Sequence, residues 1–432
     1  MLLIKNCKVL ENGKAVERNI IAEGGIIQKI TAPSAAKSAD EIIDAKGKLA
    51  IPGLIDAHVH CREPGMTQKE DFRTAGYAAA AGGVTTILDM PNNRPATTTA
   101  WLLEEKRKLA AEKCIANYGF HFGATEGNLA EIRNAKNIAS VKVFMGSSTG
   151  DLLISNEGTL DSIMGTGKRI AVHAEDEAML KANEKSQGAG TWTAERHLEA
   201  RNKMVAASAA SLAITAAKRK NARMHLCHIS TAEETELMAK FRRNMNLSCE
   251  VTPHHLFLPV EDAAKLGTMA KVNPPLRRKE DVAALWNALN SGTIDMVATD
   301  HAPHLLEEKS SDEPPSGMPG LETMLPLLLD AMNRGRLSMQ QVISLTSANP
   351  ARVFGIQSRG HIAEGYFADI TLIDLKKEKT VRNDELQTKC KWSAFEGWKL
   401  KGTVASTIIN GRLAYDGSQV IDEHKGNEAM FG

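Results

Sequence analysis

The stretch Gly53-Leu54-Ile55-Asp56-Ala57-His58-Val59-His60 places two histidines two residues apart at the end of an apolar run. Side chains alternate between the two faces of a β-strand, so a strand here directs His58 and His60 to the same face. Two imidazoles this close can bind one cation, although a lone His-x-His pair is more often two ordinary histidines. The stretch therefore predicts a strand with a metal site at its carboxyl end, if other ligand residues converge there.

Further short β-branched runs follow, separated by stretches rich in Ala, Leu, Glu and Lys, a pattern typical of repeated βα units. Eight such units predict a closed (β/α)8 barrel, the TIM barrel of the α/β class. Asn349 and Pro350 predict the start of its last helix, as cap and first-turn residue. The predicted strands are Leu54–His60, Thr85–Met90, Ala116–Phe122, Val141–Met145, Ile170–His173, Met224–Ile229, Leu247–Val251 and Met296–Asp300.

Both ends of the chain have the pattern of β-structure. Turn signals such as Asn12-Gly13 divide the first fifty residues into short strands, and Asn410-Gly411 near the other end is a strong hairpin signal. Neither end is long enough to bury a core alone. We therefore predict a small composite β-sandwich domain of residues 1–52 and 356–432, beside a barrel domain of residues 53–355.

Composition limits the partners of the 432-residue chain. Its 53 basic and 52 acidic side chains give a net charge of +1, which offers no electrostatic case for nucleic acid or a membrane surface. Lys5 and Lys8 interrupt the apolar N-terminus, so no signal peptide is expected, and no apolar run could span a bilayer. Six scattered cysteines suit free thiols in a reducing cytoplasm. We expect a cytoplasmic protein that acts on a small molecule.

The ends of the predicted strands carry residues suited to bind metal. In a (β/α)8 barrel the carboxyl ends of the strands converge on one point. Imidazole and carboxylate groups are ligands that suit zinc, and this set is large enough for two ions. The candidates are His58, His60, Lys142, His173, His228 and Asp300.

Lys142 is the exception, because a protonated ammonium cannot bind a cation. From residue type alone, a lysine that ends a strand and pairs with an acidic residue is the more frequent case. In the alternative, burial beside two cations depresses the pKa of the amine, which adds carbon dioxide and becomes a bridging carbamate. Cys61 and Cys227 neighbour candidate ligands, so alternation predicts that they point to the opposite faces and serve in packing.

Several motifs together resemble the amidohydrolase superfamily and, within it, the dihydroorotases. They are His58–Gly65, Gly82–Thr86, Met90-Pro91-Asn92, His225–Thr231 and Thr299–His304, and the resemblance extends over nearly the whole chain. It implies a zinc-dependent cyclic amidohydrolase that interconverts L-dihydroorotate and N-carbamoyl-L-aspartate in de novo pyrimidine synthesis. It also implies two zinc ions bridged by a carboxylated Lys142, and a homodimer.

The chain departs from the family pattern near Lys142, the ligand expected to bridge the two zinc ions. Many bacterial dihydroorotases of the long type have an Asp-Asp-Gly segment in this region that supplies an aspartate ligand. This chain has Gly150-Asp151 without the tandem. Asp151 therefore stays an alternative ligand if Lys142 is unmodified.

Substrate recognition can be argued from charge, since dihydroorotate carries a carboxylate and a planar guanidinium is its natural bidentate partner. Without the resemblance, a lone Arg or Asn in a loop would be read as a solvated surface group. Asp300 is expected to be catalytic, passing a proton from water to the leaving ring nitrogen. The resemblance assigns substrate binding to Arg62, Asn92, Asn273 and His304, and the loop after the eighth strand adds Pro319 and Gly320, unless that loop only links two elements.

Two other functions stay open. Hydantoinase, dihydropyrimidinase or allantoinase activity needs the same metals but no anchor for a ring carboxylate, and the resembling allantoinase motif lacks the pair Arg62 and Asn92. A non-catalytic scaffold would keep the barrel and lose the chemistry, but such relatives typically lack several ligands. Every ligand position is filled in this chain, which favours an enzyme.

Overall fold

The computed structural model describes residues 1–34, 39–146 and 152–432. Eight parallel strands form a barrel in which each strand pairs with its neighbours in chain order. Each overlaps a predicted strand, so the barrel is confirmed. The strands are β6 (Leu54–Val59), β7 (Val84–Asp89), β8 (Asn117–Gly123), β9 (Ser140–Phe144), β10 (Arg169–His173), β11 (Arg223–Leu226), β12 (Leu247–Val251) and β13 (Met296–Val297).

The barrel closes between β6 and β13 through few backbone contacts. Val59 forms a bridge with His301 beyond the end of β13, and the His60 amide donates to the His301 carbonyl over 2.8 Å. The Asp56 carboxylate accepts from the Thr299 amide at 3.1 Å and from the Thr299 hydroxyl at 2.5 Å. The prediction of a strand as far as Asp300 was too long, because Asp300 itself has a left-handed φ of 47°.

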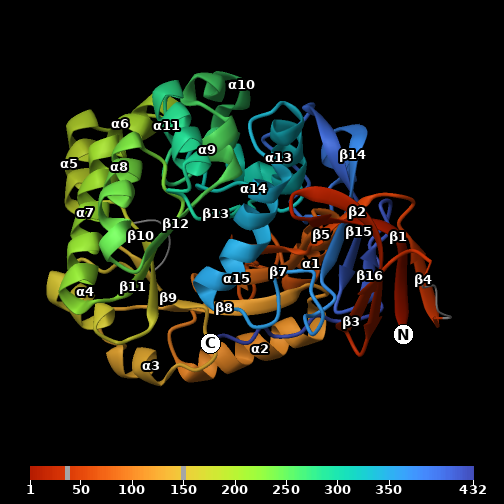
Figure 1. Ribbon diagram of the computed structural model, residues 1–432. Coiled ribbons are helices and arrows are strands. Elements are labelled where there is room, and N and C mark those ends of the chain that lie inside the picture. The colour runs from red at the N-terminus through yellow and green to blue at the C-terminus, as the bar shows by residue number, and fades with distance from the viewer. Residues whose placement is uncertain (35–38, 147–151) are drawn as a thin grey trace.

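Helices connect the strands and cover the outside of the barrel (Figure 1). In α7, for example, buried small residues lie three and four positions apart on one face and let the helix approach the barrel closely. They include Ala206, Ala209, Ala210 and Ala213. The helices are α1 (Phe72–Ala81), α2 (Ala100–Lys113), α3 (Leu129–Asn134), α4 (Glu157–Met164), α5 (Glu177–Gln187), α6 (Ala194–Ala200), α7 (Lys203–Lys220), α8 (Ala232–Phe241), α9 (Pro253–Phe257), α10 (Ala263–Leu266), α11 (Lys279–Asn290), α12 (Leu306–Lys309), α13 (Met324–Asn333), α14 (Met339–Ile343) and α15 (Asn349–Phe354).

The last helix, α15, begins at Asn349 with Pro350 in its first turn, as predicted, but Asn349 does not cap it with its side chain. A π-helical turn at Ser344–Ala348 joins α14 directly to α15, and Asn349 donates from its side chain to the Asp295 carbonyl over 2.7 Å. Pro350 has no amide hydrogen, so it cannot donate to the preceding turn of the helix. The wider π-turn just before Pro350 is a usual way for a helix to absorb such an interruption.

A second sheet, built from both ends of the chain, lies beside the barrel (Figure 1). Its order is β16-β15-β14-β5-β1-β2-β3, and β4 also pairs with β1. The two termini therefore combine as predicted, although their strands join in one branched sheet and not in two separate ones. The strands are β1 (Leu2–Glu11), β2 (Lys14–Glu23), β3 (Ile26–Thr31), β4 (Glu41–Asp44), β5 (Leu49–Pro52), β14 (Ile370–Thr380), β15 (Lys399–Ile409) and β16 (Arg412–Tyr415).

This terminal sheet has a core of its own, to which Ile4, Ile20, Ile370 and Ile408 contribute from both ends of the chain. On this basis we propose two domains, residues 1–52 with 356–432, and residues 53–355. The last residues of the chain return to the barrel, where the Ala429 amide donates to the carbonyl of Tyr118 on β8 over 2.7 Å.

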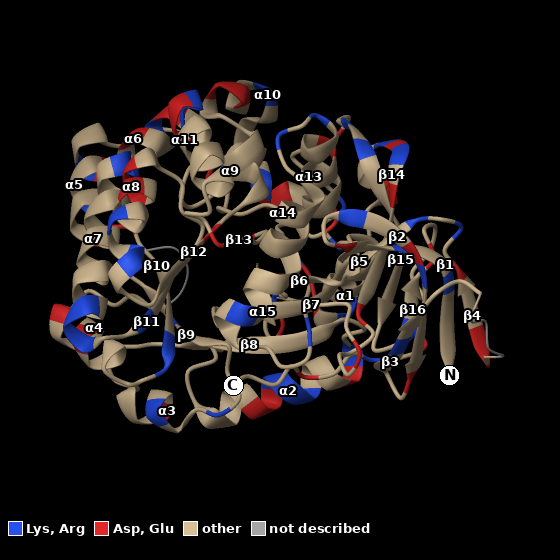
Figure 2. Ribbon diagram, in the orientation of Figure 1, with Lys and Arg blue, Asp and Glu red and all other residues tan. Residues whose placement is uncertain are grey.

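Charged residues of both signs are scattered over the outer helices and the terminal sheet (Figure 2). All six cysteines are free and buried. Within the described part of the chain, no helix has the length and apolar character needed to cross a membrane.

Candidate metal centre

The predicted ligands come together where the barrel strands end. His58 Nε2 lies 3.3 Å and His60 Nε2 lies 3.0 Å from the same oxygen, Oδ1 of Asp300. His173 Nδ1 lies 3.0 Å from His228 Nε2. The ring centres of His58 and His228 are 5.2 Å apart, so the two groups adjoin. All five side chains are buried or nearly so.

This donor set fits divalent cations. Two nitrogens that bind one zinc ion at 2.0–2.1 Å lie about 3.3 Å apart in tetrahedral geometry, and the pair His173 Nδ1 and His228 Nε2 is close to that separation. The outward-facing nitrogens are also held, His60 Nδ1 by Asn92 Oδ1 at 2.7 Å and His173 Nε2 by Glu175 Oε2 at 2.8 Å. Such partners fix the ring orientation and the tautomer of metal-binding histidines.

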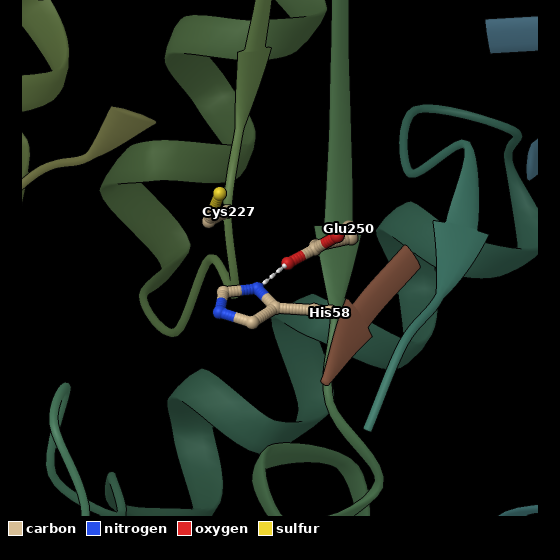
Figure 3. A group of neighbouring side chains, drawn as sticks. All are labelled: His58, Cys227 and Glu250. Carbon is tan, nitrogen blue, oxygen red and sulfur yellow. Dashed lines mark hydrogen bonds and ion pairs between the residues drawn. The ribbon is translucent and has the colours of Figure 1, made fainter. Parts of the chain in front are cut away.

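Glu250, which the sequence pattern did not single out, lies beside His58 (Figure 3). It stands on β12 with Oε1 2.5 Å from His58 Nδ1 and Oε2 3.0 Å from His225 Nε2. Burial alone would raise the pKa of Glu250, but His58 and His225 hold it well below its usual value. The sequence signal for Glu250 is a carboxylate inside a strand that is otherwise buried, because a buried charge needs a partner.

The carboxylates of Asp300 and Glu250 place an excess of negative charge beside His58. Burial and Lys142 oppose protonation of His58, yet Asp300 and Glu250 outweigh them and raise its pKa to about 10. A proton and a metal ion compete for the same His58 nitrogen, so this excess also favours a cation. Burial lowers the pKa of the three other imidazoles, those of His60, His173 and His228, and keeps them in the neutral form that binds metal. The pKa of His60 falls to about 4.

Lys142 projects from β9 into this group and is fully buried. Its Nζ lies 3.0 Å from Cys227 Sγ and 5.0 Å from the centre of the Phe144 ring. Among the residues that the structure describes, it forms no ion pair with a carboxylate, in contrast to the ordinary strand-end lysine. Asp151, the alternative ligand, lies outside the described residues.

Cys227 departs from the prediction that it points away from the site. Its Sγ lies in one group with ligand atoms of His58 and Glu250 (Figure 3). Regular alternation does not apply at this point, because β11 ends at Leu226 and His228 has a left-handed φ of 35°. Cys61, by contrast, packs in the apolar core, as predicted.

A cleft opens above the imidazoles. Its wall includes three of the predicted substrate-binding residues, Arg62, Asn92 and Asn273. Ser316 and Gly317, from the loop after β13, also line it. His304 is buried behind this wall, with Nε2 3.0 Å from Arg62 Nη2. Burial and the charges of Arg62, Lys69 and Lys309 hold the pKa of His304 far below its usual value, so it is neutral.

Pro319 and Gly320 are not among the described residues that line this cleft. The loop passes behind His301, where the Gly320 amide donates to His301 Nδ1 over 3.1 Å. The backbone approaches the cleft three residues earlier, at Gly317, which has a φ of 139°. A Cβ there would lie 2.6 Å from the Ala302 carbonyl oxygen, so only glycine fits.

Sequence comparison agrees with this arrangement. The profile described as Amidohydrolase family matches residues 49–414, which include every strand of the barrel and all the ligands above. The chain belongs to the amidohydrolase family. Amidohydrolases typically bind metal, and the imidazoles and Asp300 are the residues of this member that could hold it.

Curated relatives that match this chain include dihydroorotases. The one from Methanosarcina mazei is 41% identical over 411 residues, which cover 91% of this chain and 90% of that protein. The one from Pyrococcus furiosus is 36% identical over 431 residues, covering 100% and 96%. Among solved amidohydrolase structures, L-hydantoinase (dihydropyrimidinase) from Arthrobacter aurescens has a TM-score of 0.95 at 29% identity and covers 99% of both chains.

Proposed function

We propose that the protein is a dihydroorotase, which reversibly hydrolyses the ring amide of L-dihydroorotate to N-carbamoyl-L-aspartate in pyrimidine biosynthesis. One observation carries this proposal: the Arg62 guanidinium lies in the wall of a cleft whose base is formed by four imidazoles and Asp300. The cleft therefore offers an anchor for a carboxylate next to groups that can bind metal. The names of the archaeal relatives support the same substrate.

We propose two zinc ions in this centre. His58, His60 and Asp300 would hold one, and His173 and His228 the other, with a carboxylated Lys142 between them. The burial of Lys142 beside these imidazoles supports the modification, because a permanent ammonium there would be buried without a direct ion pair to a carboxylate of the described residues. When bound, the ions supply a Lewis acid for the ring carbonyl and lower the pKa of water.

Asp300 is placed to move the proton. Burial would raise the pKa of its carboxyl group, but His58 and His60 hold it well below its usual value. The carboxylate is thus ionised at the start, as a general base must be. It takes a proton from the attacking water and delivers it to the leaving ring nitrogen. In ring closure it accepts a proton from the carbamoyl nitrogen.

The cleft wall next to the imidazoles would recognise the substrate. Arg62 offers its guanidinium to the ring carboxylate, and Asn92 and Asn273 offer amide groups at the same wall. His304 contacts Arg62 from behind. The backbone of Ser316 and Gly317 is placed to meet the ring edge, and Pro319 and Gly320 would support this loop.

A hydantoinase or dihydropyrimidinase is the second candidate, favoured by the likeness to solved hydantoinase structures. Those substrates need the same metals and no carboxylate anchor. Purified protein should be assayed side by side on L-dihydroorotate, dihydrouracil, hydantoin and allantoin. We expect the highest kcat/KM with dihydroorotate. Preference for a ring without a carboxylate would overturn the proposal.

We further propose that the chain works on its small-molecule substrate in the cytoplasm as a homodimer, without nucleic acid or membrane partners. The six buried free thiols fit a reducing compartment. A non-catalytic scaffold would be revealed by metal analysis, if purified protein held no zinc and gained no activity when zinc was added. The filled ligand positions favour bound zinc.

A further inference from the structure

Both ring nitrogens of the buried His304 face hydrogen-bonding groups. Nδ1 lies 3.0 Å from the Lys69 ammonium. Nε2 lies 3.1 Å from the Ser316 carbonyl oxygen and 3.0 Å from Arg62 Nη2. These contacts connect the imidazole to two parts of the cleft wall at once.

The chemistry of these partners selects one tautomer. An ammonium can only donate, so the nitrogen that faces Lys69 must accept and carries no hydrogen. The hydrogen of the neutral imidazole is then on Nε2, where it donates to the Ser316 carbonyl. Arg62 also can only donate, and it cannot hydrogen bond to a protonated Nε2. Its Nη2 hydrogens therefore stay available to a ligand in the cleft.

The Lys69 ammonium is itself fixed in place. Oε1 of Glu308, on α12, lies 2.9 Å from Lys69 Nζ, and only 13% of the Lys69 side chain is exposed. The other oxygen of Glu308 accepts from the Leu305 amide over 3.0 Å. The backbone of His304 is held as well, because Trp392 donates to its carbonyl over 2.7 Å. Lys69 and His304 thus meet in a rigid setting.

We propose that Lys69 is a positioning residue for substrate recognition: it fixes His304 in the Nε2-protonated tautomer and so leaves Arg62 free to bind a ring carboxylate. This inference rests on the proposed function of the cleft. It gives Lys69, which is not among the residues that line the cleft and contacts His304 and Glu308, an effect on substrate affinity.

Removal of the ammonium makes the other tautomer available. Glu308 Oε2 lies 3.6 Å from His304 Nδ1 and could then accept a hydrogen from it. Nε2 would lose its hydrogen, release the Ser316 carbonyl and accept from Arg62 instead. Both changes weaken the carboxylate site, since the guanidinium is engaged and the loop at Ser316 loses a tether.

The test is Lys69→Met, compared with Lys48→Met. Lys48 is also in an ion pair of 2.9 Å, with Asp374 in the terminal sheet away from the cleft. We expect Lys69→Met to raise the KM for dihydroorotate by about tenfold or more, the effect of losing a hydrogen bond to a charged group, and to change kcat by less than about threefold. Inhibition by orotate, which carries the same carboxylate, should weaken in parallel. Lys48→Met should leave all three constants unchanged.

A background without the imidazole separates positioning from general stability. In His304→Gln protein, Lys69→Met should add less than about a twofold change in KM, because the two residues act as one unit. Lys69→Arg keeps a cationic donor and should retain more of the wild-type KM. If Lys69→Met folds poorly, Lys69→Arg decides the matter through these same constants.

The outcomes are distinguishable. An unchanged KM in Lys69→Met, or effects of Lys69→Met and His304→Gln that simply add, would overturn the inference while the wild-type enzyme still turns over dihydroorotate. Failure of the wild-type protein to turn over dihydroorotate would instead overturn the proposed function.

Discussion

His58 Nδ1 lies 2.5 Å from Oε1 of Glu250, and both side chains are almost completely buried. Glu250 thereby fixes the His58 ring so that the opposite nitrogen, Nε2, faces Asp300. The same carboxylate binds His225 through its other oxygen. A single glutamate on β12 thus sets the orientation of a candidate ligand that comes from β6, on the far side of the barrel closure.

Glu250→Gln should weaken zinc binding by about 10-fold to 100-fold, the usual cost of losing a partner that orients a ligand. The amide cannot supply the negative charge that favours the metal-binding orientation and basicity of His58. Competition with a chromogenic chelator measures the affinity. Glu236→Gln, at an exposed position on α8, is the matched control and should bind zinc as wild type does. Equal affinities in both variants would show that Glu250 has no such role.

Asp300→Ala should keep the fold and abolish turnover, because no other described carboxylate contacts both His58 and His60. Circular dichroism and thermal unfolding check the fold, and ring opening and ring closure are assayed separately. Since a single proton carrier serves both directions, both rates should fall together. Turnover close to that of wild type would remove Asp300 from the mechanism.

Lys106→Met should lower the free energy of unfolding by about 3–5 kcal/mol, because it leaves the buried carboxylate of Asp89 without its ion-pair partner. Lys106 also donates to the Met90 carbonyl over 2.8 Å, so its loss disturbs the loop that carries Asn92. Urea unfolding measures the change. Lys108→Met, on the same helix, breaks only the exposed pair with Glu105 and should leave the free energy of unfolding nearly unchanged. Similar losses in the two variants would contradict the assigned role of Lys106.

His197 should make the protein less stable as the pH falls. Burial and then the charge of Arg201 lower its pKa to about 3, and the neutral ring donates to the Val272 carbonyl over 2.9 Å. Between about pH 6.5, the unfolded value, and pH 3, the unfolded chain binds the extra proton, so the free energy of unfolding falls with pH by at most about 1.4 kcal/mol per unit.

The variant His197→Gln isolates this contribution, since its amide can still donate to Val272. Urea unfolding of both proteins between pH 7.5 and pH 5.5 should show a shallower loss in the variant. Parallel curves for the two proteins would mean that His197 does not contribute.

The barrel could be predicted because its signals are local. The alternation that directs His58 and His60 to one face needs only the residues of β6, and the spacing of the eight strands needs only chain order. The convergence of the predicted ligands then follows from the barrel geometry. The same reasoning could not find Glu250, since its partner His58 is 192 residues away and only the closed barrel brings the two together.

Errors arose where the backbone leaves regular geometry. Cys227 faces the site and Asp300 lies beyond β13, because residues at both strand ends adopt left-handed φ values, which strand alternation does not anticipate. The loop after β13 approaches the cleft at Gly317 and not at Gly320 for a steric reason, the contact with Ala302, that depends on tertiary structure. The bridging role of Lys142 stays a proposal, because a carbamate leaves no trace in the sequence.

The most direct test of a metal-dependent dihydroorotase is the turnover of L-dihydroorotate by purified protein before chelation, after chelation and after zinc is restored, with zinc content measured at each step. We predict that activity disappears when zinc is removed and returns as about two ions per chain are bound again. Full turnover by protein that contains no metal would contradict the proposed metal-binding role of the four imidazoles and Asp300.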